Sequence, residues 1–282
     1  MHVFQTQKEL QIELNKTKNQ SKKIGFVPTM GALHQGHLSL LEESLSENEI
    51  TVLSIFVNPT QFNNADDLKK YPRILEKDVE LVKKLNKNIL IYAPSVTDIY
   101  EGKTISTSFN YDGLENQMEG KHRPGHFDGV GTIVKKLFEI IKPTNAYFGE
   151  KDFQQLQIVR KLVTKHKIPV NIVGCEIFRE TSGLAMSSRN ERLSENARKE
   201  SKLIYQILSQ AKEKFVSKSA NEVVIFVEKE FKKHTNFALE YFEIAAEDTL
   251  LTCKRKVKNK KYRGFIAVFI ENIRLIDNIS LK

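Results

Sequence analysis

Residues 24–37 read IGFVPTMGALHQGH. The first four residues form an apolar run typical of a buried strand, and Pro28, Gly31 and Gly36 indicate that a turn follows it. Four leucines between residues 38 and 45 then predict an amphipathic helix. A strand, a glycine-containing turn and a helix N-terminus form an arrangement that receives phosphate, because backbone N–H groups and the positive end of the helix dipole converge there.

Two histidines, His34 and His37, stand three residues apart in this stretch. The plainest interpretation is a pair of turn histidines, and a second is two of the four ligands of a metal site. No carboxylate or thiol is close enough in sequence to complete a set of four zinc ligands. Ligands from distant parts of the chain are left open as an alternative. A histidine pair at a helix N-terminus suits a nucleoside triphosphate, because it can donate hydrogen bonds to phosphate oxygens while charge grows during transfer.

Composition sets broad limits on the protein. The chain has 282 residues, enough for one large domain or two modest ones, and is 40% hydrophobic and 28% charged, as in ordinary globular proteins. Its net charge of +9 favours anionic ligands or nucleic acid in a general way. Cys175 and Cys253 lie in unrelated contexts, so we expect a reducing compartment without a disulfide framework. The N-terminus lacks a signal-peptide core and no apolar run approaches the ~20 residues of a membrane span, so we expect a cytoplasmic protein.

Short apolar runs alternate with helical patterns through the first part of the chain. This alternation predicts βαβ units and an α/β fold, with a parallel sheet and ligands at the carboxyl ends of its strands. The expected strands are Ile24–Val27, Thr51–Val57, Ile89–Tyr92, Ala146–Phe148 and Val170–Val173. The expected helices are 36–46, 73–87, 128–141 and 152–166. Residues 94–127 have no clear periodicity and are interpreted as a functional or mobile stretch.

The pattern changes near residue 180. Helical segments at 194–215 and 219–234 precede a small set of strands, which predicts a second, α+β domain. The strand candidates are Leu239–Ala246, Gly264–Ile270 and Arg274–Ile276. We therefore divide the chain into residues 1–180, which would bind nucleotide and substrate, and residues 181–282, a smaller domain expected to close over the nucleotide.

Polar loops follow several expected strands. The strand expected at 51–57 ends in the Asn-Pro break at 58–59, which would place Asn58 and Gln61 at the carboxyl end of the sheet. Neutral amides there can fix a hydroxyl or carboxylate group of a small substrate. Arg123 belongs to a loop, GKHRPGHFDGVGT (120–132), that can face an anion before a helix with Asp128 as its candidate N-cap. A capped turn and a solvated loop are the respective structural alternatives.

Two further loops carry cations. Lys151 lies where a strand turns through Gly149 into a helix, at an edge where a cation would meet phosphate, while Asp152 and Gln155 have the form of a capping box. Residues 187–189 read SSR, and two hydroxyls beside a guanidinium make a phosphate clamp, with a polar linker as the alternative. Together these loops argue for one shared site better than any of them argues alone.

In combination the motifs resemble the pantoate–β-alanine ligase (pantothenate synthetase) family. The resemblance rests on PTMGALHQGH (28–37), NPTQF (58–62), YPR (71–73), RPGHF (123–127), GEKDFQQ (149–155) and MSSRN (186–190). It runs from about residue 20 to Ile279 and includes YFEI (241–244) and RLIDN (274–278). The His-x-Gly-His motif alone is shared by nucleotidyltransferases, including class I aminoacyl-tRNA synthetases, whereas the full combination is far more specific.

The resemblance implies a two-step ligation that uses ATP. Pantoate attacks the α-phosphorus of ATP to give pantoyl adenylate and pyrophosphate, and β-alanine then attacks the adenylate to give pantothenate and AMP. The implied fold is a Rossmann-like parallel sheet with helices on both faces plus a smaller C-terminal α+β domain, usually in a homodimer. Mg²⁺ is expected to accompany ATP with no protein ligand assigned, and no membrane or nucleic-acid partner is expected.

The resemblance also assigns residues to ligands. His37 is implied as a proton or hydrogen-bond donor, and the implied catalytic set is His34, His37, Lys151, Ser187, Ser188 and Arg189. The residues implied at ATP are Met30, Gly31, Ala32, Leu33, His34, Gln35, Gly36, His37, Gly149, Glu150, Lys151, Asp152, Phe178, Met186, Ser187, Ser188 and Arg189. Those implied at pantoate or β-alanine are Gln61, Gln155, Asn58 and Arg123.

Some features depart from that pattern or leave alternatives open. Ser182 stands where family members often carry Asp, and Phe178 where a small aliphatic residue is common. Seven of the ten residues in 254–263 are basic, which indicates a solvated hairpin tip or, as an alternative, an RNA-binding segment with salt-sensitive affinity. A second enzymatic alternative is adenylation of a phosphorylated small molecule, although the uncharged Gln61 and Gln155 fit pantoate better.

Overall fold

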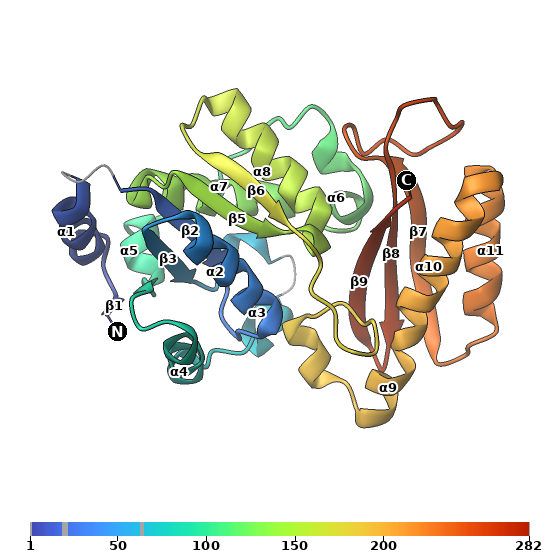
Figure 1. Ribbon diagram of the computed structural model, residues 1–282, viewed down its shortest axis with the longest axis horizontal. Coiled ribbons are helices and arrows are strands. Elements are labelled where there is room, and N and C mark those ends of the chain that lie inside the picture. Colours follow the sequence, from blue (N-terminus) through green and yellow to red (C-terminus); the bar gives the residue numbers. More distant parts are fainter. Residues whose placement is uncertain (1, 19–21, 63–64, 282) are drawn as a thin grey trace. The chain divides into compact units, whose positions relative to one another are not determined.

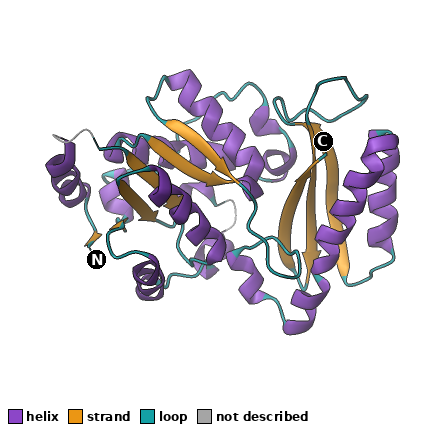
Figure 2. Cartoon of the chain, viewed as in Figure 1, coloured by secondary structure: helices purple, strands orange, loops and turns teal. Residues whose placement is uncertain are grey.

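The computed structural model describes residues 2–18, 22–62 and 65–281. It divides into two compact units, one comprising Met1–Glu150 and Gln155–Glu176 and the other comprising Lys151–Gln154 and Ile177–Lys282. The first unit alternates strands and helices, and the second combines helices with a separate small sheet (Figure 2). In the parts of the chain that the structure describes, no helix is long and apolar enough to cross a membrane.

The first unit is built on a parallel sheet in the order β1-β4-β3-β2-β5-β6 (Figure 1). Its strands are β1 (Val3–Phe4), β2 (Ile24–Thr29), β3 (Ile50–Ile55), β4 (Leu90–Tyr92), β5 (Asn145–Gly149) and β6 (Asn171–Cys175). From β2 the chain adds strands first on one side, through β3 and β4, and then on the other, through β5 and β6. The order therefore reverses between β2 and β5, where open α/β sheets bind ligands at the carboxyl ends of their strands.

Helices cover both faces of this sheet. Phe26 on β2 meets Phe138 of α7 edge-on, with ring centroids 6.2 Å apart, whereas its neighbour Val27 shares a core cluster with Leu41 of α2. Successive residues of a strand face opposite sides of the sheet, so α2 and α7 lie on opposite faces. The helices are α1 (Gln7–Lys18), α2 (Gln35–Glu47), α3 (Ala65–Lys70), α4 (Leu75–Leu85), α5 (Val96–Tyr100), α6 (Met118–His122), α7 (His126–Ile141) and α8 (Phe153–His166), with 3₁₀ turns η1 (Pro59–Gln61), η2 (Leu114–Asn116) and η3 (Glu150–Asp152).

The second unit has an antiparallel sheet in the order β7-β8-β9, with α10 and α11 lying side by side along it (Figure 1). Leu208 of α10, Val227 of α11 and Ile266 of β8 belong to one buried core, which holds the helices on the sheet. The elements are η4 (Ser188–Arg192), α9 (Glu195–Glu200), α10 (Lys202–Ser217), α11 (Ala220–Lys232), β7 (Phe237–Ala246), β8 (Tyr262–Ile270) and β9 (Ile273–Ser280).

The predicted α/β fold with a smaller C-terminal α+β part is confirmed, while several local predictions were wrong. Asp128 is not an N-cap, because α7 begins at His126 with Gly125 as its N-cap at φ 77°, and the Asp128 carboxylate instead accepts the Phe109 N–H at 2.9 Å. The helix predicted over 194–215 is two helices that meet at Ser201. Residues 94–127 contain α5, η2 and α6.

Candidate functional site

A buried carboxylate shapes the turn between β2 and α2. Gly31 and Ala32 both adopt left-handed backbone conformations, with φ 81° and 51°. The N–H groups of Ala32 and Leu33 donate to the two carboxylate oxygens of Asp78, at 3.0 and 2.8 Å. Asp78 lies in the first turns of α4 and is 2% exposed, and a Cβ at position 31 would stand only 3.0 Å from its Oδ2. The turn therefore depends on a residue that lies outside the sequence motifs.

A contact with the His34 backbone N–H determines which ring nitrogen of His37 carries the proton. His34 is the N-cap of α2 and His37 is the third residue of the helix. The His34 N–H donates to Nδ1 of His37 at 3.2 Å, and the two rings lie 4.0 Å apart between centroids. A ring nitrogen that accepts a hydrogen bond carries no proton, so the neutral imidazole carries its proton on Nε2. His37 is thereby arranged to donate a hydrogen bond through Nε2.

Gln61 is held from both its side chain and its backbone. Its Nε2 donates to the Met30 sulfur at 2.9 Å, which ties η1 to the turn after β2. Its carbonyl oxygen contacts His126 Nδ1 at 2.8 Å and accepts from Arg123 Nη2 at 3.5 Å. Met30, Gln61 and Arg123, which belong to three separate sequence motifs, are thus brought together in the first unit. His126 joins them; it belongs to the motif RPGHF (123–127) but was not assigned to a ligand from the sequence.

Asn58 is 1% exposed, and protein partners occupy its whole amide group. Its Oδ1 accepts from the Tyr100 hydroxyl at 2.5 Å and from Thr60 Oγ1 at 3.1 Å. Its Nδ2 donates to Gln61 Oε1 and to the Gly129 carbonyl, both at 3.1 Å. Burial raises the pKa of Tyr100, so its hydroxyl keeps the proton that it donates. This geometry suits a residue that orients Gln61 rather than one that contacts a substrate.

Gly129 lets α7 approach the turn that carries Gln61. A Cβ at position 129 would lie 2.3 Å from the Thr60 carbonyl oxygen and 2.7 Å from the Gln61 Cα. Contacts of that length with backbone atoms cannot be relieved by a side-chain rotation, so only glycine fits without moving the helix or the turn. Of the other selected residues of this unit, Gln35 and Gly36 begin α2, Gly149 ends β5, Glu150 begins η3 and Gln155 is a half-buried residue of α8.

In the second unit, residues 178–189 form a folded loop. The Met186 N–H donates to the Phe178 carbonyl at 3.0 Å, and Arg179 pairs with Ala185 in an antiparallel bridge. Ser187 caps η4, its hydroxyl accepting the Arg189 N–H at 3.3 Å. The side chains from 186 to 189 are half-buried. The structure therefore brings Phe178 together with the serine and arginine residues that were selected as a phosphate clamp.

Lys151 belongs to the same unit through the short segment Lys151–Gln154. Its ammonium lies 3.9 Å from Asp152 Oδ1, and its side chain is 19% exposed. Its carbonyl oxygen accepts a hydrogen bond from Asn278 Nδ2 on β9 at 2.9 Å. Asp152 is exposed, so its carboxylate is screened by water and holds the ammonium only weakly.

The basic run 254–263 is divided between a loop and a strand. Residues 254–261 lie in the connection between β7 and β8, where Lys260 is 3.6 Å from Asp248 and Lys256 lies over the Phe215 ring. Arg263 is a buried residue of β8, paired with Glu247 at 3.0 Å. The interpretation as a solvated hairpin tip was therefore wrong for Arg263. Over the described ranges, no group of three or more His, Cys, Asp or Glu residues is placed to hold a metal ion.

Comparison with known proteins shows which family this chain belongs to. The model of the family described as pantoate–β-alanine ligase matches residues 2–280. The chain belongs to this family. Proteins named pantothenate synthetase from Flavobacterium psychrophilum and Christiangramia forsetii are 68% and 53% identical to it over 282 residues, covering 100% of each pair of chains.

Solved members of the pantoate–β-alanine ligase family share the fold over the whole length. A pantothenate synthetase from Thermus thermophilus superposes with a TM-score of 0.92 at 38% identity, covering 100% of this chain and 99% of its own. The Francisella tularensis ligase, solved in complex with beta-gamma ATP and β-alanine, gives a TM-score of 0.82 at 37% identity, covering 100% of this chain and 98% of its own.

Ser182, one of the two departures from the family pattern, has a structural use. Its hydroxyl accepts the Leu184 N–H at 3.4 Å across the tight turn at Gly183. An aspartate carboxylate accepts the same kind of bond, so serine preserves the turn. The other departure, Phe178, uses its carbonyl for the pairing with Met186, and the residue is 41% exposed, so its bulk does not disturb the loop.

Replacing Asp78 by asparagine should destabilise the first unit. The asparagine side chain has only one acceptor oxygen. Its NH₂ group would face one of the two backbone N–H donors, Ala32 or Leu33. Hydrogen bonds to charged groups contribute about 1.5–3 kcal/mol, so we expect a loss of about 2 kcal/mol and a fall in Tm of roughly 4–8 °C. Thermal unfolding checks this result, with Glu76→Gln, an acid in the same turn of α4, as the matched control. Equal melting temperatures for the two variants would contradict it.

Proposed function

We propose that this chain is an ATP-dependent ligase that joins pantoate to β-alanine and releases AMP and pyrophosphate. The observation that supports this most directly is the family match over residues 2–280, with relatives named pantothenate synthetase along the whole chain. The Francisella tularensis relative, solved with beta-gamma ATP and β-alanine, supports the choice of nucleotide and amine.

The reaction has two steps, and neither forms a bond to the protein. In the first, a carboxylate oxygen of pantoate bonds to the α-phosphorus of ATP, and pyrophosphate leaves with the electron pair of the broken P–O bond. In the second, the β-alanine amine bonds to the acyl carbon and loses a proton as AMP leaves. Positioning and charge stabilisation are therefore the contributions required of the protein.

In the first unit, His37 is proposed to donate its Nε2 proton in a hydrogen bond to the α-phosphate, with His34 beside it. This role is supported by the contact that leaves the proton on Nε2. Gln61 and Gln155 are proposed to bind the hydroxyl and carboxylate groups of pantoate. Asn58 and Arg123 are proposed to hold Gln61 in place. This proposal replaces the expectation that they contact the substrate directly.

In the second unit, Lys151, Ser187, Ser188 and Arg189 are proposed to bind the phosphates of ATP. Cations and hydroxyls suit the negative charge that moves onto pyrophosphate as it leaves. Phe178, Met186 and Asp152 are proposed to contact the nucleotide beside them, and Gly149 and Glu150, which belong to the first unit, are also assigned to the nucleotide. The half-buried positions of residues 186–189 suit groups that must meet a ligand while being held by the fold.

Mg²⁺ is proposed to enter as the Mg–ATP complex and not as a resident metal. The cation neutralises phosphate charge, and ATP phosphates with water suit its preference for oxygen ligands. In a titration of Mg²⁺ at constant ATP, the initial rate should follow the concentration of the complex. We also propose that the protein works in the cytoplasm as a homodimer. Sedimentation equilibrium would measure the mass of the assembly and so test the homodimer.

The decisive assay is AMP formation by the purified chain. We expect AMP only when ATP, pantoate and β-alanine are all present, together with pantoate-dependent exchange of pyrophosphate into ATP without β-alanine. Omitting each substrate in turn provides the controls. The proposed function would be overturned if AMP forms equally well without pantoate, or if no AMP forms in the complete mixture.

A further inference from the structure

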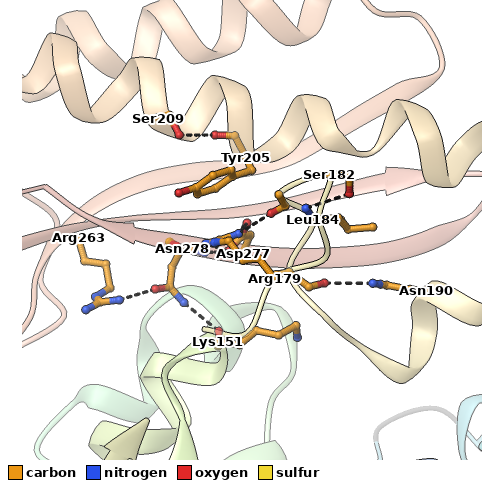
Figure 3. A network of polar contacts seen from close by, with 12 residues as sticks. Lys151, Arg179, Ser182, Leu184, Asn190, Tyr205, Ser209, Arg263, Asp277 and Asn278 are labelled. Carbon is orange, nitrogen blue, oxygen red and sulfur yellow. Dashed lines mark hydrogen bonds and ion pairs between the residues drawn. The ribbon is translucent and has the colours of Figure 1, made fainter. Parts of the chain in front are cut away.

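Asn278 on β9 lies at the centre of a polar network in the second unit. Figure 3 shows its amide between Arg263 and Lys151, with Asp277 and Arg179 beside it. Asn278 is 1% exposed and Asp277 4%. Neither residue was selected from the sequence as part of a site.

The orientation of the Asn278 amide is fixed by a cation. Arg263 Nη1 donates to Asn278 Oδ1 at 2.6 Å, so the amide oxygen faces the guanidinium and the NH₂ group faces away. That NH₂ group donates to the Lys151 carbonyl oxygen at 2.9 Å. Arg263 is itself restrained, because its Nε donates to Glu247 Oε1 at 3.0 Å and its guanidinium lies over the Phe153 ring, 4.0 Å from the ring centroid.

The other side of the strand is anchored by an ion pair. Arg179 donates to the two Asp277 carboxylate oxygens at 2.6 and 2.9 Å and to the Asn278 carbonyl at 3.2 Å. The same guanidinium donates to the Gly183 carbonyl at 3.0 Å and lies 3.9 Å from the Tyr205 ring centroid. Bidentate arginine–carboxylate pairs fix geometry strongly, so the strand at Asn278 is a rigid base.

We propose that Asn278 is a positioning residue for Lys151, acting through the Lys151 backbone carbonyl. The inference rests on the proposed function, in which the Lys151 ammonium meets the phosphates of ATP. A lysine side chain is a point charge on a flexible stem, and its backbone is the part that a neighbour can fix beforehand. Fixing it before ATP binds removes an ordering cost that would otherwise fall on adenylation.

The contact to the carbonyl can be removed while the contact to Arg263 stays. Asn278→Asp keeps an oxygen facing Arg263 but has no N–H to donate, and Asn278→Ala removes both contacts without adding charge. We expect each variant to lower pantoate-dependent ATP–pyrophosphate exchange roughly tenfold, chiefly through kcat/KM for ATP, with the KM for pantoate unchanged. Asn259→Asp, the same substitution at an exposed loop position, is the matched control.

A double-mutant cycle separates positioning from general stability. If Asn278 acts through Lys151, then adding Asn278→Asp or Asn278→Ala to Lys151→Met should change the exchange rate less than about twofold, because the ammonium is already absent. A full tenfold loss in both backgrounds, or no loss in the wild-type background, would overturn the proposal. The wild-type assay is read first, so a chain that forms no AMP refutes the proposed function, whereas an active chain with an additive cycle refutes only the role of Asn278.

Discussion

His37→Ala lowers the rate of pantoate-dependent adenylation by roughly 100-fold or more, the scale of losing one donor to developing charge in a transition state. The expectation follows from the contact between the His34 N–H and His37 Nδ1, which leaves the imidazole proton on Nε2. Alanine removes that proton and also leaves the His34 N–H without the ring that accepts it. The measurement is isotope exchange between pyrophosphate and ATP in the absence of β-alanine.

His234→Ala is the matched control for this change. His234 is an exposed histidine that follows α11, and the proposed mechanism does not use it. The control should exchange pyrophosphate at the wild-type rate. A His37→Ala enzyme that exchanges at a near-normal rate would show that the imidazole is not a donor to the reacting phosphate.

Lys151→Met should lower kcat/KM for ATP by up to roughly 100-fold. Methionine keeps most of the length and apolar stem of lysine but removes the charge. A hydrogen bond to a charged group contributes about 1.5–3 kcal/mol, and each 1.4 kcal/mol is tenfold in an equilibrium constant. The KM for pantoate should not change, because Lys151 is assigned to the phosphates. Exchange rates measured as a function of ATP and of pantoate separate the two effects.

Lys258→Met provides the comparison for Lys151. Lys258 is exposed in the connection between β7 and β8 and has no role in the proposed mechanism. We expect wild-type kinetics from this variant at all salt concentrations. If Lys151→Met loses no more activity than Lys258→Met, the assignment of Lys151 to ATP is wrong.

The fold was predictable from the sequence where a local residue pattern is typical of one strand or one helix. The alternation of apolar runs with helical spacing identified β2 to β6 and the helices α2, α4, α7 and α8, because strands buried on both faces and helices buried on one face have those patterns. It did not identify α1. β1 was missed because it has two residues and exists only through pairing with β4. The start of α7 was misplaced because Gly125 supplies the N-cap through its backbone conformation, which no side chain announces.

The candidate site was predictable only in its local motifs. The turn with His34 and His37 could be inferred because a strand, glycines and a helix stand together in sequence. Asp78 could not, because a carboxylate in the first turns of a helix looks like an ordinary favourable charge near the helix dipole. Its contacts join positions separated by 45 and 46 residues. Asn278, similarly, gains its role from positions 15 and 127 residues away.

The carboxylate of Asp78 has a consequence for the design of inhibitors. Two consecutive left-handed residues aim successive N–H groups into one concavity, the kind of nest that captures anions. In this protein the nest after β2 already holds an anion of its own, since both N–H groups are bonded to Asp78. A compound whose acidic group is aimed at residues 31–33 would therefore meet a like charge. An inhibitor should instead present a neutral group or a cation to this turn and carry its acid toward His37.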